Sequence, residues 1–339
     1  MSTQKEQFID SHAHIVPAGL VDEARTSGKS LGVTVEDTDR GPALQFEGLV
    51  QLRPLGGLAQ LEPRLEWMTT QGLDQQILAS WLDIHGYTLF PDKAATWARL
   101  FNEHLAELVG SNGDTFRGLA TVPIQDGTMA AKELEYAVNT LGMLGTMVSA
   151  DPVGHDLSQD SYEPLWAAAE SLGVPIVLHP ATHGFGGGIT PNYLTFSLGR
   201  TLDTTITAAK LILEGLFDRH PNLKMVLVHG GGFLPYQAAR IDNGYRSGAG
   251  RPVELKRDKP SDYLEMLYYD TVNMSPDSLR MLRNVAGAEH IMLGSDYVFS
   301  GTPQPLTEPV REAGFEPVEY QLICCGSAQK LFFEENQSG

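Results

Sequence analysis

Strand-like and helix-like segments alternate along most of this chain, and the alternation restricts the fold to few architectures. Eight short apolar runs are each followed by a segment in which apolar residues recur with helical spacing. The predicted strands are 8–12, 75–80, 116–122, 145–149, 175–178, 224–228, 267–272 and 291–293. Eight successive βα units favour a (β/α)₈ TIM barrel over an open doubly wound sheet. The dinucleotide-binding alternative also lacks its phosphate loop, because GxGxxG follows none of the early strands.

The helices predicted between and after these strands are 61–71, 92–110, 127–141, 162–172, 204–220, 234–245, 277–285 and 318–333. Residues 16–62 interrupt the alternation, because glycine and proline punctuate the segment and leave neither a helical nor a strand period. A short hairpin between 33–35 and 44–46 is the exception. We interpret 16–62 as an insertion after the first strand, within a single barrel domain that spans 1–339.

Composition excludes several classes of partner and location. The formal net charge is −18, so a basic surface for nucleic acid is not expected. Apolar runs long enough to cross a bilayer are missing, and the N-terminal residues lack the apolar core of a signal peptide. The two cysteines, Cys324 and Cys325, are neighbours and cannot build a disulfide framework. These features predict a cytoplasmic protein that acts on a small molecule, without a nucleic acid or membrane partner.

Ligand-type side chains stand where several predicted strands end. His12 and His14 are spaced i, i+2, which places both imidazoles on one face of a strand. His179, His229 and Asp296 each follow another apolar run. Because the active site of a barrel lies at the carboxyl ends of its strands, these five side chains are expected to converge.

Three histidines and a carboxylate suit Zn²⁺ or a similar divalent ion and leave one coordination position open. His12, His14, His179 and Asp296 make such a set, and His229 is then a proton shuttle with a near-neutral pKa. The spacing also permits the reverse assignment, in which His229 is a ligand and Asp296 is the base. The fourth strand, 145–149, contains no lysine that could bridge two ions, so a single metal is favoured. Asp10 either orients a metal-bound histidine or caps a turn.

The stretches DSHAHIVP, VLHP, LVHGGGFLPYQAARIDNGY and MLGSDY occur in this order. Together they resemble the amidohydrolase superfamily. They are most similar to the 2-amino-3-carboxymuconate-6-semialdehyde decarboxylase family, which also holds aromatic acid decarboxylases. The resemblance implies that His12, His14, His179 and Asp296 bind the metal. It also implies that His229 activates the metal-bound water.

The same resemblance implies three substrate contacts. Arg240 matches an arginine that reaches into a neighbouring subunit's site and holds a substrate carboxylate, which implies a homodimer. Arg53 is the best match for a second arginine, and Tyr193 occupies the place of a tryptophan. The glycine-rich segment 184–188 is interpreted as a loop, on which His183 could line the pocket.

Two reaction classes fit these residues. In the first, a small unsaturated or aromatic carboxylic acid is protonated at the carbon that bears the carboxylate, and carbon dioxide leaves without an organic cofactor. In the second, a metal-bound hydroxide attacks a lactone, amide or ene-acid, as in hydrolases and hydratases. The resemblance favours the decarboxylase, with Zn²⁺ as the expected ion and Mn²⁺ as the alternative. A third hypothesis, a metal-binding barrel that acts as a sensor, predicts metal without turnover.

Overall fold

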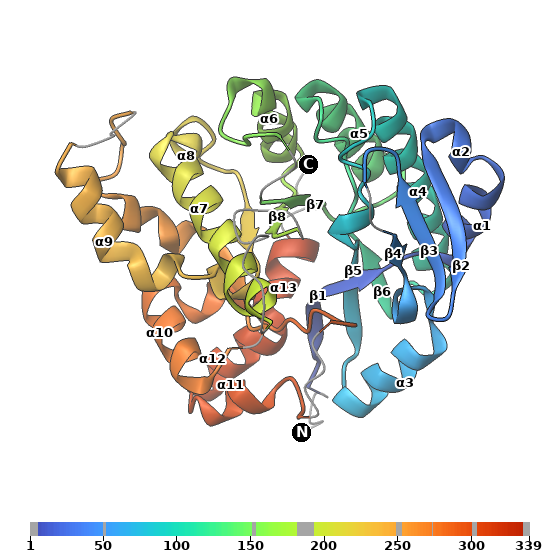
Figure 1. The fold of residues 1–339 in the computed structure, drawn as a ribbon. Coiled ribbons are helices and arrows are strands. Elements are labelled where there is room, and N and C mark those ends of the chain that lie inside the picture. Colours follow the sequence, from blue (N-terminus) through green and yellow to red (C-terminus); the bar gives the residue numbers. More distant parts are fainter. Residues whose placement is uncertain are drawn as a thin grey trace.

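Parallel strands form the centre of the protein in the computed structural model, and helices surround them (Figure 1). The structure describes residues 6–49, 52–150, 154–181, 193–248, 253–272, 274–299 and 304–334. The parallel strands in these ranges are β1 (Ile9–Ile15), β5 (Gln75–Ser80), β6 (Phe116–Gly118), β7 (Thr146–Ser149), β8 (Ile176–His179), β9 (Met225–Leu227), β10 (Tyr268–Asp270) and β11 (Ile291–Met292). They correspond to the eight strands that the sequence predicts.

The eight strands belong to two parallel sheets that meet at both edges. The first sheet has the order β1-β5-β6, and the second has the order β11-β10-β9-β8-β7. A parallel bridge between Ala120 and Thr146 joins β7 to the segment after β6. On the other side, Ala13 bridges Tyr297, and the Ser11 amide donates to the Leu293 carbonyl at 2.8 Å. These contacts give the cyclic neighbour order of a (β/α)₈ barrel.

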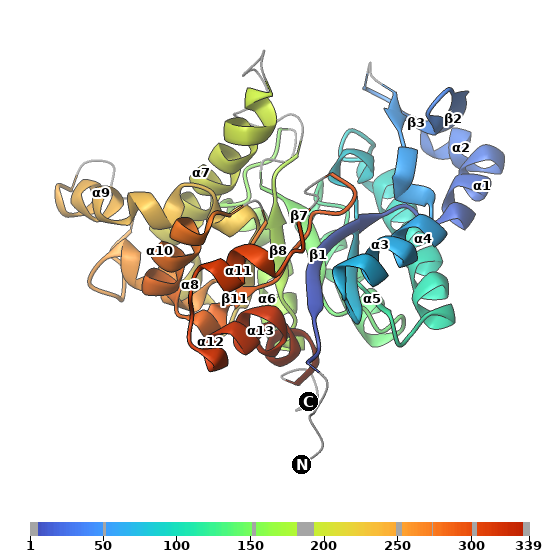
Figure 2. The same cartoon turned by 90° about the horizontal axis from the view of Figure 1, so that it is seen from below.

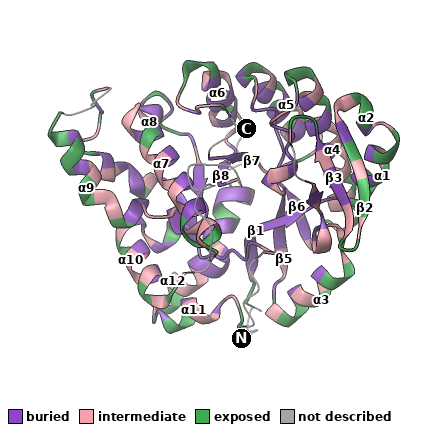
Figure 3. Cartoon of the chain, in the orientation of Figure 1, coloured by how far each residue is buried: buried purple, intermediate pink, exposed green. Residues whose placement is uncertain are grey.

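Helices cover the outside of the strands (Figures 1 and 2), and the sides of the helices that face the strands are largely buried (Figure 3). In α4, for example, Trp97, Phe101 and Leu105 lie at i, i+4 and i+8 and are all buried. From residue 62 onward, the helices are α3 (Glu62–Gln71), α4 (Pro91–Ser111), α5 (Gly127–Asn139), α6 (Glu163–Leu172), α7 (Arg200–Leu213), α8 (Leu216–Arg219), α9 (Leu234–Arg246), α10 (Pro276–Ala286), α11 (Glu308–Glu312), α12 (Pro317–Gln321) and α13 (Ser327–Gln329). Within the described residues, no helix is both long enough and apolar enough to span a membrane.

Two predicted helices differ from the observed ones. The prediction of one helix over 204–220 is wrong, because Gly215 adopts a φ of +72° and separates α7 from α8. α7 also begins earlier than predicted, at Arg200. The predicted helix 318–333 is a series of short segments, in which π-helical turns at Leu322–Gly326 and Lys330–Glu334 flank α13.

Residues 16–62 are more regular than the sequence indicates. They contain α1 (Ala18–Thr26), α2 (Gly28–Leu31), β2 (Val33–Thr38), β3 (Gly41–Phe46), β4 (Arg53–Pro54) and a 3₁₀ turn at Gly56–Ala59. The predicted hairpin is confirmed by the antiparallel pairing of β2 with β3. The prediction that this segment has no helical period is wrong, because α1 forms there and buries Leu20, Val21 and Ala24. That pattern is only one turn of apolar residues, too short to stand out from the surrounding glycines.

Asn102, in the middle of α4, connects that helix to the barrel wall. Its fully buried side chain donates from Nδ2 to the Thr121 carbonyl at 2.9 Å and to Glu133 Oε1 at 2.8 Å. Its Oδ1 accepts from the Thr121 amide at 2.8 Å. The carboxamide thus satisfies backbone groups just after β6 that the helix would otherwise leave without partners.

Replacing Asn102 by alanine is therefore expected to lower the free energy of unfolding by about 2–4 kcal/mol, because buried partners lose their hydrogen bonds. Asn112→Ala is the matched control, because the Asn112 side chain donates to the Leu108 carbonyl at the end of the same helix. Urea denaturation followed by circular dichroism measures both variants. Equal midpoints for the two variants would contradict the anchoring role of Asn102.

Candidate metal centre

Strand β1 supplies two imidazoles that meet at the mouth of the barrel. His12 and His14 point to the same side, and their Nε2 atoms lie 3.2 Å apart. Both side chains are buried, with exposed fractions of 1% or less. The strand is buried along its whole length, which fits its position in the barrel wall. The i, i+2 spacing thus gives the convergence that the sequence predicts.

His179 and Asp296 complete the group from two other strand ends. His179 is the last residue of β8, and its Nε2 lies 3.1 Å from His14 Nε2. Asp296 follows β11, and its Oδ1 lies 3.1 Å from His14 Nε2 and 3.6 Å from His12 Nε2. One ligand atom from each of the four residues lies within 4.8 Å of every other. The structure therefore brings together the four residues predicted to bind metal.

The opposite nitrogen of each imidazole is already held by an acceptor. Nδ1 of His12 lies 2.7 Å from Asp270 Oδ2, and Nδ1 of His14 lies 3.0 Å from the Ser80 carbonyl oxygen. Nδ1 of His179 lies 2.6 Å from the Pro180 carbonyl oxygen. Because a carbonyl or carboxylate oxygen only accepts, each Nδ1 carries the proton, and each Nε2 presents a lone pair. Three lone pairs therefore face one another at the centre.

This arrangement fits a divalent cation. Among the described residues, Asp296 Oδ1 is buried without a hydrogen-bond partner, although it faces the three Nε2 atoms. A tetrahedral ion with bonds of about 2.0–2.2 Å holds its ligands about 3.3–3.6 Å apart. The separations of 3.1–3.6 Å between neighbouring candidate ligand atoms lie close to that spacing. A cation would turn the facing lone pairs from a repulsive arrangement into a stabilising one.

The directions of the pKa shifts of His14, His179 and Asp296 also suit a metal, whereas that of His12 does not. Burial lowers the pKa of His14, and burial together with the neighbouring histidines lowers the pKa of His179 well below its usual range. Burial opposes ionisation of Asp296, but its contacts with His14 and His229 outweigh that effect and hold its pKa well below normal. Burial likewise opposes protonation of His12, whose pKa is nevertheless raised by the adjacent Asp270. Neutral imidazoles and an ionised carboxylate are the forms that bind metal ions.

Asp270, at the end of β10, is a functional residue that the sequence prediction omits. Its Oδ2 accepts from His12, while its Oδ1 accepts from the amides of Gly230 at 3.2 Å and Val272 at 3.1 Å. It therefore orients the imidazole of His12, a predicted ligand, and also fixes the turn after His229. The strand-end rule that located the histidines would have found it, because Asp270 ends an apolar run.

Asp10 has the more structural of its two predicted roles. Its carboxylate accepts from the backbone amide of His12 at 3.1 Å, and from the amide and hydroxyl of Ser295 at 2.9 and 2.6 Å. Within the described part of the chain, the hydrogen bonds of Asp10 involve backbone amides, the Ser295 hydroxyl and the Gln76 carboxamide, and none involves an imidazole nitrogen. Asp10 thus fastens β1 to the segment that carries Asp296, and it positions two ligands through their backbones.

His229 stands beside the four residues on an unusual turn. His229 itself has a φ of +55°, and Gly230, Gly231 and Gly232 all have positive φ. A Cβ on Gly232 would lie 2.2 Å from the Thr201 carbonyl oxygen, so a larger residue does not fit there. This turn directs His229 inward, and its Nε2 lies 3.5 Å from Asp296 Oδ2. The two carboxylate oxygens of Asp296 thus face the ligand histidines and His229 respectively.

A cavity of about 780 Å³ opens in front of His229 and Asp296, a size typical of small-molecule sites. Among the described residues, its lining comprises Tyr193, Phe196, Ser197, Arg200, Thr201, His229, Gly230, Gly232, Phe233, Tyr236, Val272, Met274, Ser278, Met281, Asp296 and Phe299. Tyr193, a predicted substrate contact, is among them. His183 and the segment 184–188 lie outside the described residues.

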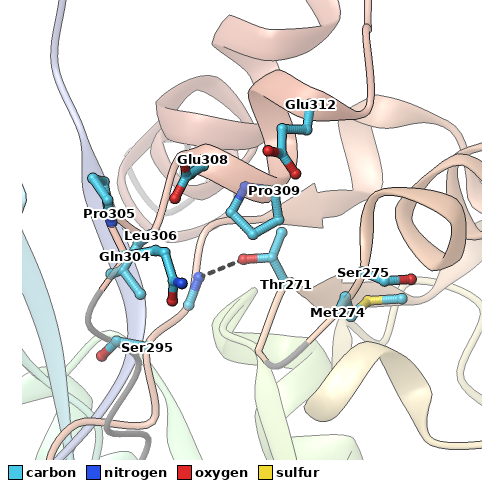
Figure 4. Close-up of a pocket in the computed structure, with 11 residues that line it drawn as sticks. Thr271, Met274, Ser275, Ser295, Gln304, Pro305, Leu306, Glu308, Pro309 and Glu312 are labelled. Carbon is cyan, nitrogen blue, oxygen red and sulfur yellow. Dashed lines mark hydrogen bonds between the residues drawn. The ribbon is translucent and has the colours of Figure 1, made fainter.

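A second cavity, of about 480 Å³, lies between the segments after β10 and β11 and helix α11 (Figure 4). Thr271, which lines this cavity in Figure 4, accepts at Oγ1 a hydrogen bond of 3.2 Å from the Gly294 amide. Met274 lines both this second cavity and the cavity in front of His229.

The two predicted substrate arginines lie elsewhere. Arg53, in β4, is 5% exposed, and its Nε lies 3.4 Å from Asp83 Oδ2, just beyond the end of β5. Arg240 is exposed on α9. Neither is among the residues that line the cavity of this chain. Their predicted substrate contacts therefore stay predictions.

Comparisons with known proteins place the chain in a family. The family model described as amidohydrolase matches residues 9–333. The chain belongs to the amidohydrolase family. This amidohydrolase is 30% identical over 290 residues to a γ-resorcylate decarboxylase of Polaromonas sp. strain JS666, covering 79% of this chain and 86% of the relative. It is 28% identical over 309 residues to a 2-amino-3-carboxymuconate-6-semialdehyde decarboxylase of Dictyostelium discoideum, covering 90% and 86%.

A solved structure shares the fold of this amidohydrolase. It is 5-carboxyvanillate decarboxylase from Novosphingobium aromaticivorans, complexed with manganese and 4-hydroxy-3-methoxy-5-nitrobenzoic acid. The TM-score is 0.79 at 22% sequence identity, with 98% of this chain and 97% of that chain covered. The likeness confirms the predicted barrel.

The hydrogen bond from Asp270 to His12 predicts an effect on metal affinity. Asp270→Asn is expected to weaken binding of Zn²⁺ or Mn²⁺ by about 10- to 100-fold, because the imidazole loses its charged acceptor. Competition with a chromogenic chelator measures the affinity. Asp277→Asn is the control, because that carboxylate is 92% exposed on α10. Equal affinities in the two variants would show that Asp270 does not support the ligand.

Proposed function

We propose that this amidohydrolase is a metal-dependent, non-oxidative decarboxylase of a small aromatic or unsaturated carboxylic acid. The observation that carries the proposal is the convergence of three imidazole Nε2 atoms and a partnerless carboxylate oxygen at the barrel mouth, beside His229. The relatives named as decarboxylases support the reaction class. The cavity in front of the site has aromatic walls suited to a flat ring.

His12, His14, His179 and Asp296 are the proposed ligands of one divalent ion. We propose Zn²⁺, which suits three histidines and one carboxylate, with Mn²⁺ as the alternative that a structural neighbour contains. When bound, such an ion supplies a Lewis acid that polarises the oxygen atoms of the substrate.

His229 is the proposed proton carrier. Its Nε2 donates a proton to the ring carbon that bears the carboxylate, which makes that carbon tetrahedral. The carbon–carboxylate bond then breaks, its electron pair returns to the ring, and carbon dioxide leaves. Asp296 Oδ2, 3.5 Å from His229 Nε2, faces the imidazole and orients it for the transfer. The ring gains one proton and loses carbon dioxide, so neither an oxidant nor a reductant is consumed.

This proposal is tested with a panel of hydroxybenzoic acids, carboxylated phenols, carboxymuconate semialdehydes and lactones. Metal-loaded protein is expected to release carbon dioxide from at least one acid, and His229→Ala is expected to lower the rate by about 10²- to 10⁴-fold while retaining metal. His104→Ala, on the outer side of α4, is the control. Hydrolysis or hydration without carbon dioxide would overturn the decarboxylase. Full-rate release by His229→Ala would overturn the role of His229.

We also propose that the protein is a homodimer in which Arg240 acts across the interface. Arg240 lies one turn after Tyr236 on α9, so both side chains share a helix face. Tyr236 is 73% exposed and lines the cavity mouth, as does Tyr193, which is 69% exposed. An exposed apolar surface next to an arginine suits a second copy that would bring its own arginine toward this site.

Mixed dimers test the role of Arg240. Arg240→Ala and His229→Ala subunits are each expected to be weakly active, whereas exchanged mixtures regain about one quarter of the wild-type sites, because each mixed dimer contains one complete site. Size-exclusion chromatography with light scattering checks the oligomeric state. A lack of rescue in dimers shown to have exchanged would contradict action across the interface.

The remaining proposal concerns residues 16–62, which we take as an insertion within a single domain spanning 1–339. β4 of this segment holds Arg53 against Asp83, beyond the carboxyl end of β5. Because the site lies at the carboxyl ends of the barrel strands, this position supports a contact between Arg53 and substrate.

A further inference from the structure

Arg200 forms part of the cavity wall in front of the metal centre. It is the first residue of α7 and is only 7% exposed. Its guanidinium carbon lies 4.3 Å from the centre of the Phe196 ring, and Phe196 stacks on Tyr193 with ring centres 4.7 Å apart. These residues are spaced at helical intervals, so they form one continuous stack along the wall.

The stack gives the guanidinium a defined orientation. Contact with an aromatic ring occupies the flat face of an arginine, while its N–H groups point outward in its plane. That geometry matches the two oxygen atoms of a carboxylate, which a guanidinium binds with paired hydrogen bonds. Low exposure strengthens the attraction, because little water screens the charge.

The charge of Arg200 is distinctive within the cavity. Among the described residues that line it, Arg200 carries the one permanent positive charge, and Asp296 carries the one carboxylate. Asp296 is already committed to the histidine cluster. The other lining side chains are aromatic, aliphatic or hydroxyl-bearing, apart from His229. The chain as a whole carries a formal charge of −18, so the cation is a local feature of this wall.

Arg53 does not provide the same charge to this space. Its Nε contacts Asp83, and it is not among the lining residues of the cavity. Among the described lining residues of this chain, Arg200 is therefore the cationic side chain available to an anionic group of a ligand in the cavity.

We propose that Arg200 is a specificity-determining residue that binds a second carboxylate on the ring of an aromatic substrate. The first carboxylate then faces His229 and Asp296, and the ring lies among the aromatic side chains between them. This inference rests on the proposed decarboxylase function for its substrate, but it concerns binding and not turnover.

Equilibrium binding tests the inference without requiring catalysis. Isothermal titration calorimetry on the metal-loaded full chain compares benzoate with the three isomers of benzenedicarboxylate. The wild type is expected to bind at least one dicarboxylate about 10- to 100-fold more tightly than benzoate, because a charged hydrogen bond is gained. Arg200→Met is expected to abolish that preference and leave benzoate affinity within about threefold, whereas Arg200→Lys retains part of it.

Arg219→Met is the matched control. Arg219 lies at the end of α8, before the amino end of β9, and pairs with Glu163 on the face of the barrel away from the site. Its loss removes one positive charge without altering the preference. Thermal unfolding checks that each variant is folded, and Arg200→Gln replaces Arg200→Met if the latter is unstable.

Two results would overturn the role of Arg200: a wild type without preference for any dicarboxylate, or variants that weaken benzoate and dicarboxylate equally. The second result would indicate a purely structural role in holding the stack. Failure of the decarboxylase proposal is recognised separately, by the absence of carbon dioxide release in proteins that still show the binding preference.

Discussion

The facing lone pairs of His12, His14 and His179, with Asp296 Oδ1 beside them, are the constraint on which the rest of the site depends. Such an arrangement is costly to bury without a cation, so the surrounding fold must hold it in place. It does so with acceptors behind each imidazole and with Asp10 between two strands. Stability and chemistry are therefore coupled at the centre of this amidohydrolase.

The residues of the candidate site fall into two groups according to their position in the fold. The residues proposed to bind the metal or carry the proton stand at strand ends and are held by hydrogen bonds of the barrel. Residues that contact the distal part of a ligand stand on the stack that leads into α7 and on α9. The relatives are named for different acids, which is consistent with a division between the centre and the walls.

Sequence predicted the strands and the histidines because both follow simple periodic rules: apolar runs mark the strands, and polar residues at their ends mark the site. Helix α1 escaped prediction because its apolar pattern spans a single turn, and the break at Gly215 depends on one backbone angle. Asp270 was within reach of the strand-end rule. Arg200 was not, since its importance arises from long-range packing that places a helix start beside a strand end.

The carboxylate of Asp296 has an evolutionary consequence. One oxygen faces the histidines proposed as ligands and the other faces His229, so a single side chain carries two proposed tasks. With these proposed roles, a substitution at position 296 in a duplicated gene alters metal binding and proton transfer together. New metal or substrate preferences are therefore expected to evolve by substitutions at positions other than 296, where one change affects one property.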